Sequence, residues 1–208
     1  MGVSDRKERE KEEMRSKILD AAKALFLEKG FEKTSIRNIA DKIEYSPGTI
    51  YLYFKDKNEL FYELHILAFQ QLMIALKPKG TATSAFEGLV DMGRDYIHFG
   101  VNNPELYELM FLMEAPIDAL TCKDEIWDDG MKAFDLLKQL VIVCKQEGYF
   151  PTADADTASL NVWSFVHGLV TLKVRQRLSM FNLAEEEMMA YMLNAFQLFI
   201  EQIKCTKN

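Results

Sequence analysis

The chain has 208 residues, of which 49% are hydrophobic and 27% charged, with 25 Lys and Arg against 32 Asp and Glu. This composition is that of an ordinary globular protein of one or two domains, and it excludes wholesale disorder. No apolar run approaches the roughly 18 residues of a membrane helix, and the charged N-terminal segment lacks the pattern of a signal peptide. Three scattered cysteines argue against a disulfide framework and favour a reducing cytoplasm.

The spacing of apolar residues predicts helices and no strands. Met14, Ile18 and Leu25 recur at helical intervals in the first segment, and Gly30 stands where such a helix would end. The charged residues before this stripe, Ser4 to Glu13, are expected to be frayed or disordered. The first element is therefore an amphipathic helix that ends near residue 30.

Two short helices are predicted next, separated by a tight turn. Thr34 and Ser35 can cap the first, which ends at Ile43. Ser46 and Pro47 form a sharp start for the second, which is about two turns long. Two short helices joined in this way form a helix-turn-helix, whose second helix enters the major groove of DNA.

A further helix start follows directly. Asp56 and Glu59 have the spacing of a capping box, and the helix that they begin is predicted to run from Lys57 to Lys77. Lys57 lies in the first turn, where the helix dipole disfavours a cation, and a bound phosphate would explain its position; a solvated lysine is the alternative. The negative excess of the chain lies after residue 60, so the N-terminal part is where charge permits contact with DNA. The alternative is that the nearly neutral charge of this part carries no information about its partner.

Several short motifs keep a regular spacing across three predicted helices. They are Gly30-Phe31, Thr34-Ser35-Ile36, Ile39-Ala40 and the run from Gly48 to Leu60. They resemble the DNA-binding domain of the tetracycline-repressor (TetR) family. The resemblance implies an all-α homodimer with two domains. Residues 1–57 would form a helix-turn-helix domain with a charged arm, and residues 58–208 a helical domain for ligand binding and dimerisation. Such proteins read palindromic operators in double-stranded DNA, and most are repressors that a small-molecule inducer releases.

The resemblance also assigns DNA contacts to individual residues. Pro47 and Thr49 are expected at base edges, Gly48 allows the backbone to approach closely, and polar side chains around them bind phosphates. Tyr53 is the one contact for which packing is an open alternative. The expected DNA-binding residues are Thr34, Ser35, Arg37, Ser46, Pro47, Gly48, Thr49, Tyr51, Tyr53, Lys55 and Lys57.

The turn between the two short helices departs from the family pattern. Family members usually have Gly followed by a small aliphatic residue, where this chain has Glu44 and Tyr45. If the turn needs a positive φ, Glu44 is strained there. Its carboxylate also brings a negative charge close to DNA.

The last two predicted helices span residues 153–180 and 184–204 and are apolar on more than one face. A helix of this kind must be covered on both sides. We expect one side to face the core of the protein and the other a symmetric partner, as in a four-helix dimer interface. The alternative is that both are central helices of a monomer.

The middle of the chain is rich in Met and aromatic residues, which suit a small, largely apolar or aromatic effector. The alternative for any one of them is that it only fills the core. Trp163, His167 and Gly168 resemble a motif in one C-terminal subgroup of the family. His167 could bond a ligand or be a structural residue, with Gly168 allowing close helix packing. The expected ligand-binding residues are Met92, Tyr96, Phe99, Met110, Phe111, Trp127, Phe134, Trp163 and His167.

No catalytic motif is present, so neither an enzyme nor a cofactor is expected. Asp91, Asp95 and His98 share a helical face, but three such groups arise easily by chance and predict no metal site. The favoured function is a cytoplasmic repressor with a small-molecule inducer. Two alternatives stay open: a DNA-binding dimer without such an inducer, and a helical ligand-binding protein that has lost its DNA function.

Overall fold

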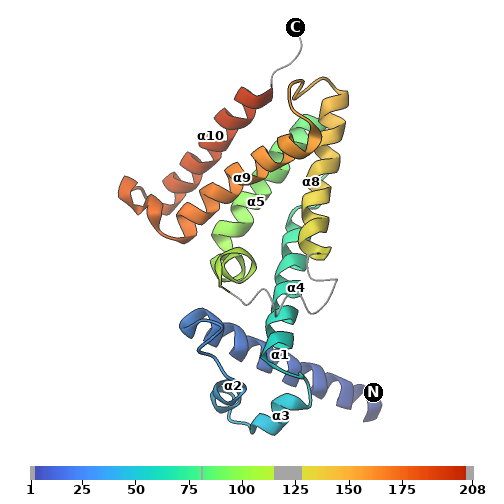
Figure 1. Ribbon diagram of the computed structural model, residues 1–208, viewed down its shortest axis with the longest axis vertical. Coiled ribbons are helices and arrows are strands. Elements are labelled where there is room, and N and C mark those ends of the chain that lie inside the picture. Colours follow the sequence, from blue (N-terminus) through green and yellow to red (C-terminus); the bar gives the residue numbers. More distant parts are fainter. Residues whose placement is uncertain (1–2, 81, 115–127, 205–208) are drawn as a thin grey trace. The chain divides into compact units, whose positions relative to one another are not determined.

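The computed structural model describes residues 3–80, 82–114 and 128–204, and these contain helices and turns but no strand (Figure 1). The chain forms two compact units. The first comprises Met1–Ala68 and Glu108–Ile126, and the second Phe69–Tyr107 and Trp127–Asn208. The all-α expectation is confirmed over the described residues.

The first unit begins with a long helix, α1 (Val3–Lys29). The expectation of a frayed start up to Glu13 is corrected, because the helix already includes these residues. Exposed ion pairs one turn apart, Arg6–Glu10 and Arg9–Glu13, support this part of the helix. Gly30 ends it in the left-handed region, with φ of 82°.

Three more helices follow: α2 (Ile36–Lys42), α3 (Pro47–Tyr51) and α4 (Lys57–Ala75). The residues of α4 up to Ala68 belong to the first unit and those from Phe69 to the second. α3 is shorter than the predicted two turns, since beyond Tyr51 the backbone tightens. The N–H of Leu52 bonds to Thr49 and that of Tyr53 to Ile50, both three residues back. α4 ends two residues before the predicted end at Lys77.

Apolar side chains from all four helices fill the core of the first unit. Phe26 and Phe31 pack against Phe61 of α4, with ring centroids 5.8 and 5.2 Å from it. Leu60 and Phe61 are buried in this core. The first unit therefore extends past the predicted domain boundary at residue 57, because the first turns of α4 supply part of its core.

The second unit contains α5 (Ala85–Asn102), α6 (Pro104–Tyr107), α8 (Asp128–Gln146), α9 (Ala155–Val174) and α10 (Glu185–Lys204). A π-helical turn, Glu108–Leu112, follows α6 and belongs to the first unit. α5 and α9 contact each other, and both contact α8 and α10, so these two are the central helices of the second unit (Figure 1).

Glycines let the helices approach α5 closely. A Cβ added at Gly93 would overlap the ring of Phe196 on α10, and one at Gly100 would overlap Val170 on α9. The predicted helix over 153–180 is divided: α9 ends at Val174, and a 3₁₀ turn, η2 (Arg177–Phe181), leads to α10.

Candidate DNA-binding face and effector site

Side chains fix the start of both short helices. Ser35 accepts a hydrogen bond from the backbone of Asn38, whose side chain bonds back to the N–H of Ser35, which is a reciprocal capping box. Ser46 accepts the N–H of Thr49 at 3.3 Å, and Pro47 occupies the first turn of α3. The predicted helix starts at Ser35 and Ser46 are confirmed.

The turn between α2 and α3 holds Glu44 in the left-handed region, with φ of 62°. Its N–H donates a hydrogen bond to the carbonyl oxygen of Asp41, and the N–H of Tyr45 donates one to that of Ala40. These bonds to α2 hold the backbone of the turn in place. The ammonium of Lys17 on α1 lies 5.0 Å from the centroid of the Tyr45 ring. Glu44 therefore occupies a conformation that favours glycine, as the sequence suggested, and its carboxylate is exposed.

Most of the expected DNA-contact residues lie at the surface around α3. Among the described residues, Ser35, Arg37, Ser46, Gly48, Tyr51 and Lys55 are exposed, while Pro47, Thr49, Tyr53 and Lys57 are half-buried. Leu52, which sequence reasoning missed, is 80% exposed at the end of α3. An exposed Leu beside a recognition helix suits contact with a thymine methyl group, but nothing in its sequence position distinguishes it from a core leucine.

The expectation that Thr34 contacts DNA is corrected. Its side chain is only 2% exposed, and its hydroxyl lies 2.9 Å from the carbonyl oxygen of Gly30 and 3.2 Å from that of Leu25. The hydroxyl thus ties the end of α1 to the start of α2 and cannot reach a phosphate. Ser35, the next residue, is the exposed cap.

Lys57 and Tyr53 both have contacts within the first unit. The Lys57 ammonium donates a hydrogen bond to the carbonyl oxygen of Phe31 at 2.8 Å and lies 4.1 Å from the centroid of its ring. Tyr53 packs against the core of the unit, as the packing alternative predicted. Asp56 caps α4 as expected, but Glu59 reaches back to the N–H of Lys55 and not to that of Asp56.

In the second unit, polar side chains from α5, α6 and α9 meet in an apolar core. The Tyr107 hydroxyl lies 2.6 Å from Nδ1 of His167, and the Tyr96 hydroxyl lies 3.1 Å from the same atom. Trp163 donates its indole N–H to Tyr96 at 3.4 Å. We call these four residues the Tyr–His cluster; Tyr107, which was not among the expected ligand residues, is central to it.

Burial keeps the Tyr–His cluster uncharged. It raises the pKa of Tyr96 well above its ordinary value and that of Tyr107 to about 12. It lowers the pKa of His167, so the neutral imidazole is favoured. The cluster consequently offers hydrogen bonds without a formal charge, which suits a hydroxyl or carbonyl group on an otherwise apolar molecule.

The structure brings together only some of the other expected ligand residues. Phe134 of α8 packs edge-on against Trp163, with ring centroids 5.9 Å apart. Met92 and Phe99 are buried along α5. Met110 and Phe111 lie in the π-helical turn of the first unit, and Trp127 lies outside the described residues.

Three further findings concern metal ligands, Gly168 and membrane spans. No three His, Cys, Asp or Glu side chains within the described ranges gather as metal ligands would. Gly168 does not mediate close packing against the other described residues, because a Cβ added there would meet none of their atoms within 4 Å. In the part of the chain that the structure describes, no helix is both long and apolar enough to cross a membrane.

Family models match both parts of the chain. The model described as bacterial regulatory proteins, tetR family, matches residues 18–64, and the tetracyclin repressor-like C-terminal domain matches residues 89–196. The chain belongs to the TetR family. Members of this family are transcriptional regulators and not enzymes, and they are typically homodimers that bind DNA and small-molecule effectors.

Individual relatives agree with this assignment. The chain is 44% identical over 55 residues to the HTH-type transcriptional regulator AcrR of Shigella flexneri, covering 26% of each chain. It is 31% identical over 83 residues to the HTH-type transcriptional repressor Rv1474c of Mycobacterium tuberculosis, covering 40% of each. These matches thus span less than half the length of the curated relatives. The Bacillus subtilis transcriptional regulator FadR, solved with stearoyl-CoA, has the same fold, with a TM-score of 0.71 at 18% identity over 93% of this chain and all of that one.

Proposed function

We propose that this TetR-family regulator is a homodimeric repressor that binds a palindromic operator and that a small, largely apolar effector releases. The geometry of α2 and α3 supports the DNA-binding part of this proposal. Caps at Ser35 and Ser46 fix the starts of these two short helices, and exposed polar residues line the surface around α3. A short, rigid helix with an exposed N-terminal end fits the major groove.

The DNA contacts divide into two kinds. Pro47, Gly48 and Thr49 at the start of α3 would face base edges, and these contacts carry sequence specificity. Phosphates would be bound around them, which sets the position of the protein on the duplex. The proposed phosphate-binding residues are Ser35, Arg37, Ser46, Tyr51, Lys55 and Lys57.

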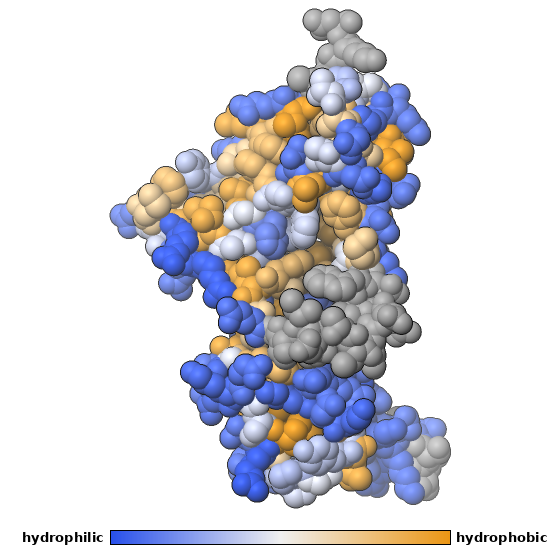
Figure 2. All heavy atoms as spheres, in the orientation of Figure 1, coloured by the Kyte–Doolittle hydropathy of each residue, from blue (hydrophilic) through white to orange (hydrophobic). Residues whose placement is uncertain are grey.

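The dimer interface is proposed on α9 and α10. Hydrophobic residues gather on the visible surface of these helices (Figure 2), and Leu160, Leu172 and Leu198 are 51%, 43% and 67% exposed. The rings of Phe165 and Phe199 stack across the two helices with centroids 4.1 Å apart. Apolar surface of this kind is costly in water, and a second copy of the same pair of helices would cover it.

The effector is proposed to bind at the Tyr–His cluster. Two hydroxyls, an indole N–H and a neutral imidazole lie there within an apolar core, and Phe134 covers Trp163. FadR of Bacillus subtilis was solved with stearoyl-CoA, a molecule with a long apolar chain. The effector would bind better to a state of the dimer whose recognition helices no longer match two successive major grooves, and so would weaken DNA binding.

Selection of binding sites from random duplex DNA with the purified protein tests the proposal. An enriched palindrome whose half-sites lie about one helical turn, 34–36 Å, or a multiple apart is expected. That operator then serves as the probe in a screen for small molecules that release it. A folded dimer that enriches no sequence would favour a ligand-binding protein without DNA function. An operator that no small molecule releases would favour a regulator without an inducer.

Since the protein acts on DNA, we also propose a cytoplasmic location.

A further inference from the structure

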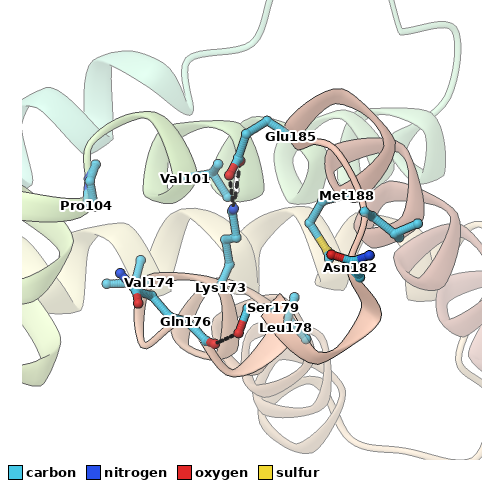
Figure 3. A pocket seen from close by; sticks show the side chains of 11 residues that line it. Val101, Pro104, Lys173, Val174, Gln176, Leu178, Ser179, Asn182, Glu185 and Met188 are labelled. Carbon is cyan, nitrogen blue, oxygen red and sulfur yellow. Dashed lines mark hydrogen bonds and ion pairs between the residues drawn. The ribbon is translucent and has the colours of Figure 1, made fainter.

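A pocket of about 520 Å³ lies in the second unit where α9 ends and α10 begins (Figure 3). Val101 near the end of α5, Val174 of α9 and Met188 of α10 give it apolar walls. Lys173 and Glu185 line it with opposite charges. Its volume is in the range of small-molecule sites, and its lining shares no residue with the Tyr–His cluster.

Lys173 is the less exposed member of the ion pair that lines the pocket. Its Nζ lies 2.8 and 2.6 Å from the two carboxylate oxygens of Glu185 (Figure 3). The Lys173 side chain is only 22% exposed, whereas that of Glu185 is 81% exposed. The ammonium of Lys173 therefore has less access to water than the carboxylate of Glu185, so an anionic partner matters more to Lys173. Glu185 can turn into water at little cost because exposed ion pairs contribute little.

The backbone around the pocket is held in an unusual conformation. Gln176 and Asn182, at the two ends of η2, both lie in the left-handed region, with φ of 56° and 50°. The Ser179 hydroxyl donates a hydrogen bond to the carbonyl oxygen of Gln176 at 2.6 Å and ties this loop together. Backbone of this kind persists where the surrounding structure holds it, and it is common beside ligand sites.

We propose that this pocket binds a small carboxylate that carries an apolar body, at a site separate from the proposed effector site. Glu185 already presents a carboxylate to Lys173 at hydrogen-bond distance, so the geometry accepts that group. The carboxylate of the ligand would replace that of Glu185 on Lys173, and the apolar body would lie against Val101, Val174 and Met188.

Titration of the full-length protein with hexanoate, followed by backbone amide chemical shifts, tests this inference. Hexanoate should give saturable shifts within residues 173–188. Acetate lacks the apolar body and hexan-1-ol lacks the carboxylate, so each should bind at least about tenfold more weakly. No saturable shift in this segment, shifts confined to Trp163 and His167, or equal binding of hexan-1-ol would overturn the proposal.

Two substitutions are expected to act in opposite directions. Lys173→Met should weaken hexanoate binding at least about tenfold. Glu185→Gln should strengthen it about two- to fivefold, because it removes the competing carboxylate of an exposed pair. Lys138→Met is the control, since Lys138 pairs with Asp156 away from the pocket, and should change nothing. If Lys173→Met fails to fold, Glu185→Gln decides: weaker binding would mean that Glu185 itself holds the ligand, and would overturn the proposal.

Discussion

At the scale of single residues, the turn of the helix-turn-helix carries a measurable strain. Glu44 has a φ of 62°, and this left-handed conformation costs a residue with a side chain about 1–2 kcal/mol. Glycine avoids this cost, but it loses more chain entropy on folding, which cancels part of the gain. Glu44→Gly should therefore raise the free energy of unfolding by about 0.5–1 kcal/mol, measured in urea. Glu44→Ala keeps the strain and should stay within about 0.5 kcal/mol of wild type. A destabilised glycine variant would contradict this account.

Lys57 tests the phosphate contacts. Lys57→Ala should lower affinity for all duplexes by a similar factor and reduce the slope of log affinity against log salt by about one. Lys77→Ala, an exposed lysine beyond the end of α4, is the control. Equal slopes in wild type and Lys57→Ala would instead assign Lys57 a purely structural part, through its bond to the carbonyl oxygen of Phe31.

His167 should make stability depend on pH. Burial lowers its pKa in the folded state, so the unfolded state binds the proton more readily. The stabilisation is present above the ordinary histidine pKa, near 6.5, and is lost as the pH falls below it. Urea unfolding of wild type and His167→Gln at several pH values should show their difference in stability shrinking towards acid pH. A constant difference would rule out this linkage.

At the scale of helices, α5 depends on a glycine for its contact with α10. Ala at Gly93 gains about 1 kcal/mol of helix propensity, but its Cβ overlaps the buried ring of Phe196. Because overpacking typically costs about 1–3 kcal/mol, we expect Gly93→Ala to destabilise the protein by about 1–2 kcal/mol in thermal or urea unfolding. Gly88→Ala on the same helix meets only ordinary contacts and should stabilise it slightly. Equal behaviour of the two variants would contradict the packing described.

At the scale of the whole molecule, the dimer is what makes a palindrome readable. Leu198→Glu would place a charge in the proposed α9–α10 interface and should raise the dimer dissociation constant at least about a hundredfold, which is about 3 kcal/mol. Sedimentation equilibrium measures the constant, and operator affinity should fall with it. Ile74→Glu, at an exposed residue of α4, is the control. A dimer of unchanged stability would move the interface elsewhere.

The sequence by itself determined what depends on neighbours along the chain. Ser35, Ser46 and Pro47 specify helix starts by local hydrogen bonds and ring geometry, so these starts, the all-α class and the family could all be read from residue order. Strain at Glu44 was expected only if the turn needs a positive φ, as the Gly usual in the family suggested, and the structure meets that condition.

Only the tertiary structure decided which distant residues meet. Thr34 and Ser35 are equivalent as capping residues, and only packing of α1 against α2 buries one of them. Tyr107 joins Tyr96 and His167 because α5, α6 and α9 converge, although 60 residues separate it from His167. The pocket at Lys173 arises in the same way, because its walls come from the end of α5 and from the ends of α9 and α10, which lie far from α5 in the sequence. Such contacts depend on helix crossing in three dimensions, which the spacing of residues along one chain does not specify.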